Sequence, residues 1–286
     1  MKTLKLYYRL TKPGIIYGNT LTVIGGFLFS FGGDFNLQRF LGVVAGVALV
    51  IASGCVTNNY LDRNIDRHMS RTKKRALVTG VISTGHALGF ATILGIAGTV
   101  VLYMLTNTLT TLLALFAWFS YVVLYGYSKR RSVQGTLVGS IAGSMPVVLG
   151  YTANTAVIDQ GAVLLFLIMV FWQMPHFYAI AMRRRDEYAA AGLPVLPVKS
   201  SLQTTKIHIL AYVVAFILGN VALFLAGYAG YSYLIIMSGL GVFWLVRGVQ
   251  GFKAKDSIAW AKGMFLYSLI VLLAFSLMIA VNFWLP

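Results

Sequence analysis

Two carboxylates and one amide form the pattern in this sequence that is best suited to chemistry. Asn58, Asp62 and Asp66 follow one another at intervals of four residues, at the end of a long apolar run. On a helix, this spacing places all three side chains on one face, about 6 Å apart along the axis. Hard oxygen ligands suit Mg²⁺, which takes one or two carboxylates and often substrate phosphates. The pattern therefore predicts a metal-assisted site for a phosphate-bearing substrate, with these three residues as ligands.

Basic residues beside this pattern are candidates for holding the phosphate oxygens. Ammonium and guanidinium groups bind phosphate through charge-assisted hydrogen bonds. The alternative is that these charges only pair with the two aspartates or mark the inner face of a membrane protein. Other acids are scarce and Asn58 falls inside an apolar run, so we favour a site. The candidate phosphate-binding residues are Arg67, Arg71, Lys74, Arg75, Lys129 and Arg130.

The composition requires lipid to cover most of the molecule. Of the 286 residues, 58% are hydrophobic and only 10% are charged, whereas a soluble domain carries about 25% charged residues. The apolar runs are long and continuous, which favours helices over a barrel whose strands alternate over about ten residues. The predicted fold is an all-α, polytopic membrane helix bundle, and we interpret residues 1–286 as a single domain.

The apolar runs predict about nine spanning helices, because each span needs about 20 mostly apolar residues. An alternative count of eight merges the two runs that are separated only around residues 106–108. The predicted spans are 14–33, 40–60, 84–105, 109–127, 134–153, 161–182, 207–227, 231–249 and 263–285.

The distribution of basic residues predicts the orientation. With the N-terminus in the cytoplasm, every Lys and Arg except Arg39 falls in an inner segment, as the positive-inside rule requires. The net charge of +16 then reflects topology and attraction to anionic lipid, and it gives no reason to expect a nucleic-acid partner. No signal peptide or transit segment is evident before the first span. We therefore expect the bacterial cytoplasmic (inner) membrane, with the aspartates at the cytoplasmic mouth.

The aspartate motif resembles the first motif of the UbiA-type intramembrane prenyltransferases. The similar residues begin at Asn58 and continue as RTKKRALVxGxIS over residues 71–83. The resemblance implies a nine-helix bundle that moves a prenyl group from a diphosphate to an aromatic or ring acceptor, with Mg²⁺ held by Asn58, Asp62 and Asp66. The segment 125–131 resembles another diphosphate contact of the family. There we expect Tyr125 to shield an allylic cation.

One departure from the general family pattern points to a particular branch. Most of the superfamily has a second paired-aspartate motif near the sixth span, whereas residues 171–188 read FWQMPHFYAIAMRRRDEY. This segment and KPGIIYGN at 12–19 resemble the branch that farnesylates haem, and the resemblance covers essentially the whole chain. Asp186 is the expected replacement for the missing pair.

Within this segment, His176 is the expected contact for haem. An ionisable residue inside a span is costly and usually functional, and neutral imidazole is a natural ligand of haem iron. The alternative is a histidine bonded to a neighbouring helix. His208 is a weaker alternative ligand, and Arg183 is expected to pair with the haem propionates.

The resemblance implies a complete reaction. A farnesyl group would pass from farnesyl diphosphate to a vinyl group of haem B, with addition of water, to give haem O for a terminal oxidase or for haem A synthase. Three alternatives stay open. One is a prenyltransferase for a quinone precursor or another aromatic acceptor. A second is a transporter, which would show inverted repeats. The third is a non-catalytic haem carrier, which would need the histidine but not Asp62 and Asp66.

Overall fold

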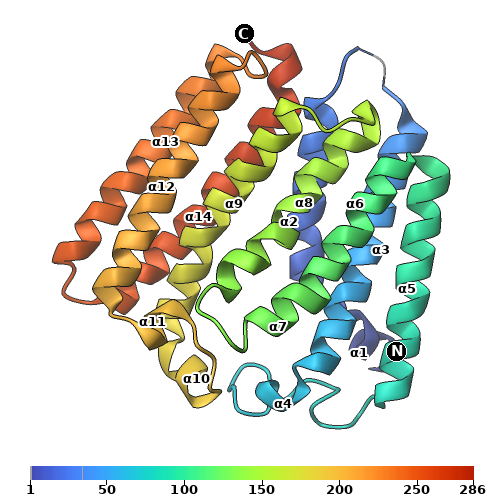
Figure 1. Cartoon of the computed structure of the whole chain (residues 1–286), viewed down its shortest axis with the longest axis vertical. Helices are drawn as coiled ribbons and strands as arrows, with labels where there is room; N and C mark the ends of the chain where they lie inside the picture. Colours follow the sequence, from blue (N-terminus) through green and yellow to red (C-terminus); the bar gives the residue numbers. More distant parts are fainter. Residues whose placement is uncertain (1, 34) are drawn as a thin grey trace.

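The structure is a computed structural model, and it describes residues 2–33 and 35–286; Met1 and Asp34 lie outside the described residues. Every regular element in the described part is a helix, as predicted, and the long helices lie side by side in a bundle (Figure 1). Eight helices of the described part are long and apolar enough to cross a membrane: Leu37–Leu61 (α3), Thr84–Leu105 (α5), Thr108–Ser128 (α6, η1 and α7), Gly135–Thr155 (α8), Gln160–Arg183 (α9), Leu202–Leu225 (α12), Tyr231–Lys253 (α13 and η2) and Ser257–Trp284 (α14 and η3).

The remaining predicted span, 14–33, corresponds to α2 (Pro13–Phe29), an apolar helix of 17 residues. This helix packs against α3, α8 and α14. The helices α5 and α6 are separate, since one ends at Leu105 and the next begins at Thr108. The two apolar runs on either side of residues 106–108 therefore form two helices and do not merge into one.

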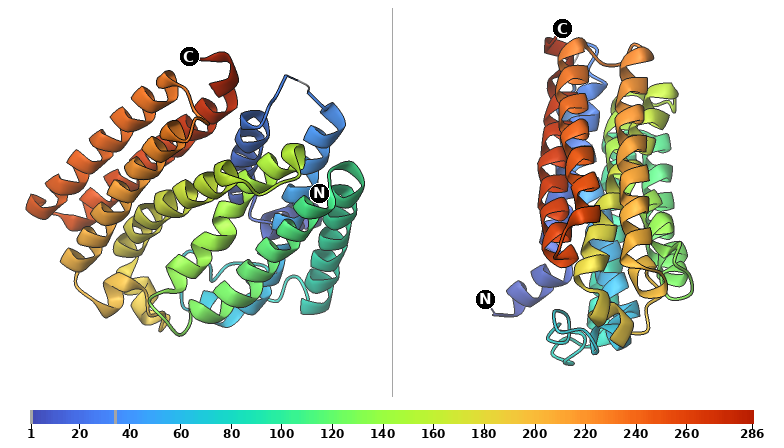
Figure 2. Two further views of the ribbon diagram at one scale, coloured as in Figure 1. Left: turned by 45° about the horizontal axis from the view of Figure 1, so that its top comes forward. Right: turned by 90° about the vertical axis from the view of Figure 1, so that its left-hand side faces the viewer.

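The short helices gather at one end of the bundle. They are α1 (Lys2–Leu10), α4 (Arg63–Asp66), α10 (Arg185–Ala190) and α11 (Leu196–Lys199). Figure 1 places α4, α10 and the end of α7 at this same end, away from the C-terminus. Figure 2 shows α1 projecting from the bundle there. The two basic segments predicted from the sequence thus reach the same end of the molecule.

Apolar side chains anchor the basic loop that follows α4. A small buried cluster joins the N-terminal segment, α3, this loop and the start of α5. Its members are Leu10, Val56, Ala76, Leu77, Ile82, Ala87 and Ala91. The loop is therefore packed against the mouth of the bundle, which positions its charged side chains.

Large apolar side chains also cover the outside of the bundle. Ile93 and Met104 on α5 and Ile235 on α13, for example, are 67%, 72% and 69% exposed. Such an apolar surface suits the hydrocarbon core of a membrane. Helices can cross this core because they satisfy their own backbone hydrogen bonds. The outward faces therefore fit a multi-pass membrane protein.

Glycines allow α2 and α8 to approach each other closely. A Cβ atom at Gly26 would overlap the carbonyl oxygen of Val147, and one at Gly150 would overlap the carbonyl oxygen of Val23. Small residues of this kind let the backbones of membrane helices pack directly. This contact joins α2 to α8 within the bundle.

We expect Gly150→Val to force α2 and α8 apart and to lower the free energy of unfolding by about 1–3 kcal/mol, as overpacking usually does. Thermal unfolding in detergent, followed by tryptophan fluorescence, measures this effect. The matched control is Gly239→Val, because nothing lies within 4 Å of a Cβ atom added at Gly239. Equal losses in both variants would contradict the proposed close packing.

Candidate active site

Asn58 and Asp62 converge on one cation. The helical hydrogen bonds continue past the end of α3, from Asp62 N to Asn58 O (2.9 Å) and from Asp66 N to Asp62 O (2.8 Å). Lys129, just after α7, donates from Nζ to Asn58 Oδ1 at 2.8 Å and to Asp62 Oδ2 at 2.6 Å. Arg130 adds a contact from Nη2 to Asp62 Oδ1 at 3.2 Å. The structure thus brings together residues that are 67 and more positions apart in the sequence.

The electrostatic environment favours an ionised Asp62. Burial raises the pKa of this carboxyl, but the charges of Lys129 and Arg130 outweigh burial and hold the pKa below its ordinary value. Burial also lowers the pKa of Lys129, and the Asp62 carboxylate opposes that effect only in part. An ionised carboxylate that is mostly shielded from water is the state in which Asp62 can hold a metal or a cation.

Asp66 is buried and contacts a different cation. Arg75 Nη1 lies 2.6 Å from Asp66 Oδ2, and the hydroxyl of Thr72 donates to the Asp66 carbonyl at 3.0 Å. Both partners come from the loop after α4. Asp66 therefore ties this loop to the end of α3, one helical turn beyond Asp62.

Tyr125 ends a π-helical segment that the sequence did not reveal. This segment, η1 (Ser120–Tyr125), lies between α6 (Thr108–Phe119) and α7 (Gly126–Ser128), and such segments frequently occur at functional sites. The Tyr125 ring stacks on Tyr121 at 5.9 Å between centroids. Lys129 Nζ lies 4.8 Å from the Tyr125 centroid. The ring of Tyr125 thus faces the cation that joins Asn58 to Asp62, and a small cavity of about 40 Å³ adjoins both residues.

Three of the predicted phosphate-binding residues are exposed and form no ion pair with the aspartates in the described part of the chain. They are Arg67, Arg71 and Lys74, which lie on the loop after α4. Their role in binding a phosphate stays a prediction, whereas Arg75, Lys129 and Arg130 contact the carboxylates directly.

Glu187, and not Asp186, connects α10 to the basic loop. Asp186 is exposed. Glu187 Oε1 accepts a hydrogen bond from Ser70 Oγ at 2.9 Å and contacts Arg184 Nη1 at 3.3 Å. Which of these two adjacent acids meets the loop depends on how α10 is rotated, and sequence alone does not determine that rotation.

His176 is half-buried between α9 and α14. Its Nδ1 lies 2.7 Å from Ser268 Oγ, and its ring stacks on Trp172 at 5.0 Å. The Ser268 hydroxyl donates its single hydrogen to the Phe265 carbonyl at 2.6 Å, so Ser268 Oγ accepts from Nδ1–H. This assignment leaves Nε2 as the unprotonated nitrogen, which is the form that binds a metal.

The other two predicted haem contacts, Arg183 and His208, both follow His176 in the sequence. Arg183 is half-buried, and its guanidinium lies 5.4 Å from the Phe265 centroid. Since the Phe265 ring also contacts His176 at 5.0 Å, Arg183 and His176 share one neighbour. His208 is exposed on α12 and contacts the ring of Tyr178 edge-on at 6.0 Å.

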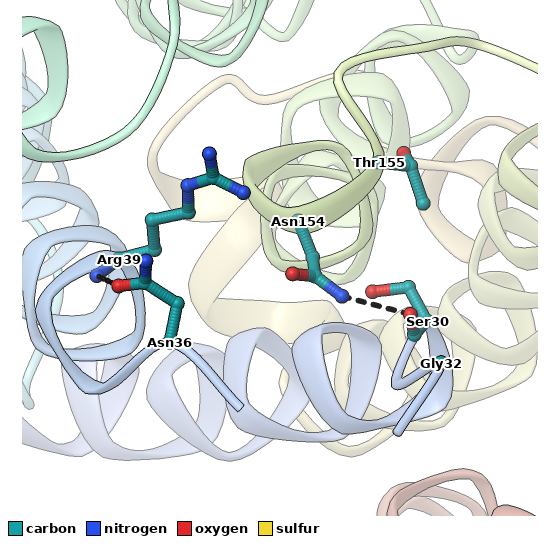
Figure 3. Close-up of a pocket in the computed structure, with 6 residues that line it drawn as sticks. All are labelled: Ser30, Gly32, Asn36, Arg39, Asn154 and Thr155. Carbon is teal, nitrogen blue, oxygen red and sulfur yellow. Dashed lines mark hydrogen bonds between the residues drawn. The ribbon is translucent and has the colours of Figure 1, made fainter. Parts of the chain in front are cut away.

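A second pocket, of about 320 Å³, is lined by residues that flank α2, α3 and α8 (Figure 3). Asn154 Nδ2 donates there to the carbonyl of Ser30 at 2.8 Å, and Asn36 Oδ1 accepts from Arg39 N at 2.9 Å. The described residues of the lining, none of which is a carboxylate or a histidine, are Ser30, Gly32, Asn36, Arg39, Asn154 and Thr155. The candidate active site is therefore the charged end, where both aspartates lie.

The donor set at the charged end fits Mg²⁺. Asn58 Oδ1 and Asp62 Oδ2 already share one cation, Lys129 Nζ. Both are hard oxygen donors, and Mg²⁺ characteristically takes one or two carboxylates while substrate oxygens and water supply the rest. The described residues contain no cluster of three or more His, Cys, Asp or Glu side chains. Asn58 and Asp62 thus present two neighbouring oxygen donors of the kind that Mg²⁺ prefers.

A membrane helix bundle with this aspartate site matches the class of protein that the sequence motif indicated. The UbiA prenyltransferase family matches residues 19–270, and the chain belongs to this family. Among its relatives is a protoheme IX farnesyltransferase from Sodalis glossinidius, 48% identical over 285 residues, which are 99% of this chain and 96% of that protein. A protoheme IX farnesyltransferase from Yersinia pseudotuberculosis is 47% identical over 281 residues, 98% of this chain and 95% of that protein.

Solved structures share the fold at low sequence identity. One is a digeranylgeranylglyceryl phosphate synthase, with a TM-score of 0.80, 22% identity and coverage of 98% of this chain and 99% of that one. Another is a UbiA homolog from Archaeoglobus fulgidus bound to GPP and Mg²⁺, with a TM-score of 0.68, 17% identity and coverage of 96% and 99%. These likenesses establish the bundle architecture.

Proposed function

We propose that this chain transfers a farnesyl group from farnesyl diphosphate to a vinyl group of haem B and adds water, which gives haem O. The observation that carries the proposal is the convergence of Asn58, Asp62 and Lys129 at the charged end of a membrane bundle. Relatives that are 47–48% identical over nearly the full chain and named protoheme IX farnesyltransferase support the choice of prenyl donor and acceptor.

Asn58, Asp62 and Asp66 would hold Mg²⁺ in this reaction. Bound there, Mg²⁺ supplies Lewis-acid stabilisation of the charge on the diphosphate. The A. fulgidus homolog, which is described as bound to GPP and Mg²⁺, supports this role. Lys129, Arg130 and the Asp66-bound Arg75 stabilise the departing anion electrostatically, in a site that is largely shielded from water. Arg67, Arg71 and Lys74 lie on the exposed face of the same loop, where an incoming diphosphate first arrives.

The bond changes in the proposed reaction balance. The carbon–oxygen bond of farnesyl diphosphate breaks, and both electrons leave with the diphosphate. The ring of Tyr125 faces the allylic cation that remains. The π electrons of the haem vinyl group form the new carbon–carbon bond. The cation produced beside the porphyrin takes up one water molecule and releases one proton, which gives the hydroxyethylfarnesyl side chain.

His176 is the proposed contact with haem iron. Its hydrogen bond to Ser268 fixes the ring and leaves Nε2 free to bind a metal. Arg183, which shares the neighbour Phe265 with His176, is the proposed partner of a propionate. Asp186 and His208 are exposed, and any contact with haem would reach them from the surface of the bundle.

The proposed setting is the bacterial inner membrane, with residues 1–286 as one prenyltransferase domain. The helix α2 serves as the ninth span, since 17 apolar residues are just long enough to cross the hydrocarbon core. The N-terminus and the active site face the cytoplasm, because this orientation places the basic loops inside. A terminal oxidase or haem A synthase consumes the product.

Release of inorganic pyrophosphate tests this function and separates the acceptors. Purified protein in lipid nanodiscs receives farnesyl diphosphate and Mg²⁺, with either haem B or a phenolic quinone precursor. We expect release only with haem B, and loss of release when EDTA removes Mg²⁺. Release only with the phenol would assign the chain to a quinone branch. Undiminished release in EDTA would contradict the role of the metal.

A further inference from the structure

The segment that contains Lys12 lies beside the candidate active site, although the aspartate motif and the segment 125–131 do not include this lysine. The carbonyl of Leu10 accepts a hydrogen bond from Asn59 Nδ2 at 2.8 Å, and Leu10 packs against Val56 on the same helix. Asn59 directly follows Asn58. The segment that leads into α2 is thus fixed against α3 beside Asn58, and Lys12 follows two residues after the fixed carbonyl.

The backbone of Lys12 is held in a strained conformation. Its φ and ψ are 54° and 66°, in the left-handed region, which residues other than Gly, Asn and Asp seldom adopt. Such positions persist only where the surrounding structure holds them, and they cluster at functional sites. Among the other described residues, positive φ occurs at glycines such as Gly80 and Gly192 and at one further residue, Ala156. At position 12, in contrast, the chain has a long cationic side chain.

The described residues supply no anionic partner for the ammonium group of Lys12. Each other cation at the site has one: Lys129 and Arg130 contact Asp62, and Arg75 contacts Asp66. Lys12 is half-buried, and its segment is fixed by the bond from Asn59 to Leu10 beside Asn58. A partly buried cation that lacks an anionic partner is suited to bind an anionic group of a substrate.

We infer that Lys12 binds the diphosphate of the prenyl substrate, together with Lys129 and Arg130. This inference rests on the proposed function, which brings the diphosphate to Asn58 and Asp62. An ammonium group is a compact charge with three donors, and it suits phosphate oxygens that are arranged around a metal. Substrate binding then supplies the anion that Lys12 lacks and ties the N-terminal segment to the two basic segments of the bundle.

Binding of inorganic pyrophosphate with Mg²⁺ to the full-length protein, measured by calorimetry in detergent, tests this inference. We expect Lys12→Met to weaken binding about tenfold or more, as loss of a hydrogen bond to a charged group does. The KM for farnesyl diphosphate should rise to a similar extent, while the KM for haem B stays unchanged. Lys5→Met is the matched control, because it removes an exposed lysine of α1, and it should leave both values unchanged.

Two further variants separate charge from backbone strain. Lys12→Arg keeps the charge and should retain most of the affinity. Lys12→Gly relieves the backbone and removes the charge, so it should lose as much affinity as Lys12→Met. Wild-type affinity in Lys12→Met or in Lys12→Gly would overturn the inference, as would failure of the wild-type protein to bind pyrophosphate with Mg²⁺.

The same measurements distinguish this inference from the proposed function. If the wild-type protein makes the haem product and Lys12→Met has an unchanged KM for farnesyl diphosphate, the role of Lys12 fails while the function stands. If Lys12→Met alone loses pyrophosphate affinity but no haem product forms in any sample, the role of Lys12 stands and the function fails.

Discussion

An Asp62→Asn variant is expected to lose turnover by a factor of about 10³, comparable to the loss of a principal electrostatic group at an active site. Asparagine has nearly the same shape, so α3 and its contact with Asn58 should stay intact. The negative charge that holds a metal, and that Lys129 and Arg130 contact at 2.6 and 3.2 Å, is lost. Single-turnover formation of farnesylated haem in nanodiscs measures the effect.

The matched control for this variant is Asp256→Asn. Asp256 caps α14 by accepting hydrogen bonds from Ile258 N and Ala259 N, and asparagine caps a helix equally well. Asp256 lies in a different loop from Asp62, and the Asp256→Asn variant removes the same charge. We expect wild-type turnover in this control. Wild-type turnover in Asp62→Asn itself would show that the metal and the diphosphate bind elsewhere.

The second large effect is expected at the haem. Removing the ring of His176 by His176→Ala should weaken haem binding at least about 10- to 100-fold, since even the residues that orient a metal ligand contribute that much. A Soret-band titration of the purified protein measures the affinity and reports the iron ligand directly. Affinity for pyrophosphate with Mg²⁺ should stay unchanged, because Asn58 and Asp62 are not altered.

Two companion variants show whether His176 is the ligand. Ser268→Ala removes the acceptor that holds Nδ1–H, so it should weaken haem binding about tenfold and shift the Soret band less than His176→Ala does. His208→Ala removes the exposed alternative and should have no effect. A lost Soret shift in His208→Ala, with an unchanged titration for His176→Ala, would assign the iron ligand to His208.

Hydropathy predicted the helices well, but it placed two of their starts too late. The predicted spans at 207 and 263 begin instead at Leu202 and Ser257. Lys206 is buried within α12, where Nζ donates to the Gly251 carbonyl at 2.8 Å and to Ser257 Oγ at 2.9 Å. A span that is predicted from a run of apolar residues begins only after such a lysine. A buried charge is tolerated only when tertiary partners hydrogen-bond it, and the sequence does not show those partners.

The candidate site was predictable where local spacing determines it. Asn58 and Asp62 share a face because helical hydrogen bonds join positions four apart, and the sequence shows that spacing. The place of Lys12 beside Asn58 depends on a left-handed backbone and on a hydrogen bond from Asn59 of another helix to Leu10. The contact of Glu187 with Ser70 likewise joins segments 117 residues apart. Contacts of this kind require the tertiary structure.

Mass spectrometry of the haem extracted after incubation of purified protein with haem B, farnesyl diphosphate and Mg²⁺ tests the central claim most directly. We predict a product heavier than haem B by one farnesyl group plus the elements of water. In water labelled with ¹⁸O, the product should gain one labelled oxygen. Unmodified haem B as the only haem recovered from active wild-type protein would contradict the account.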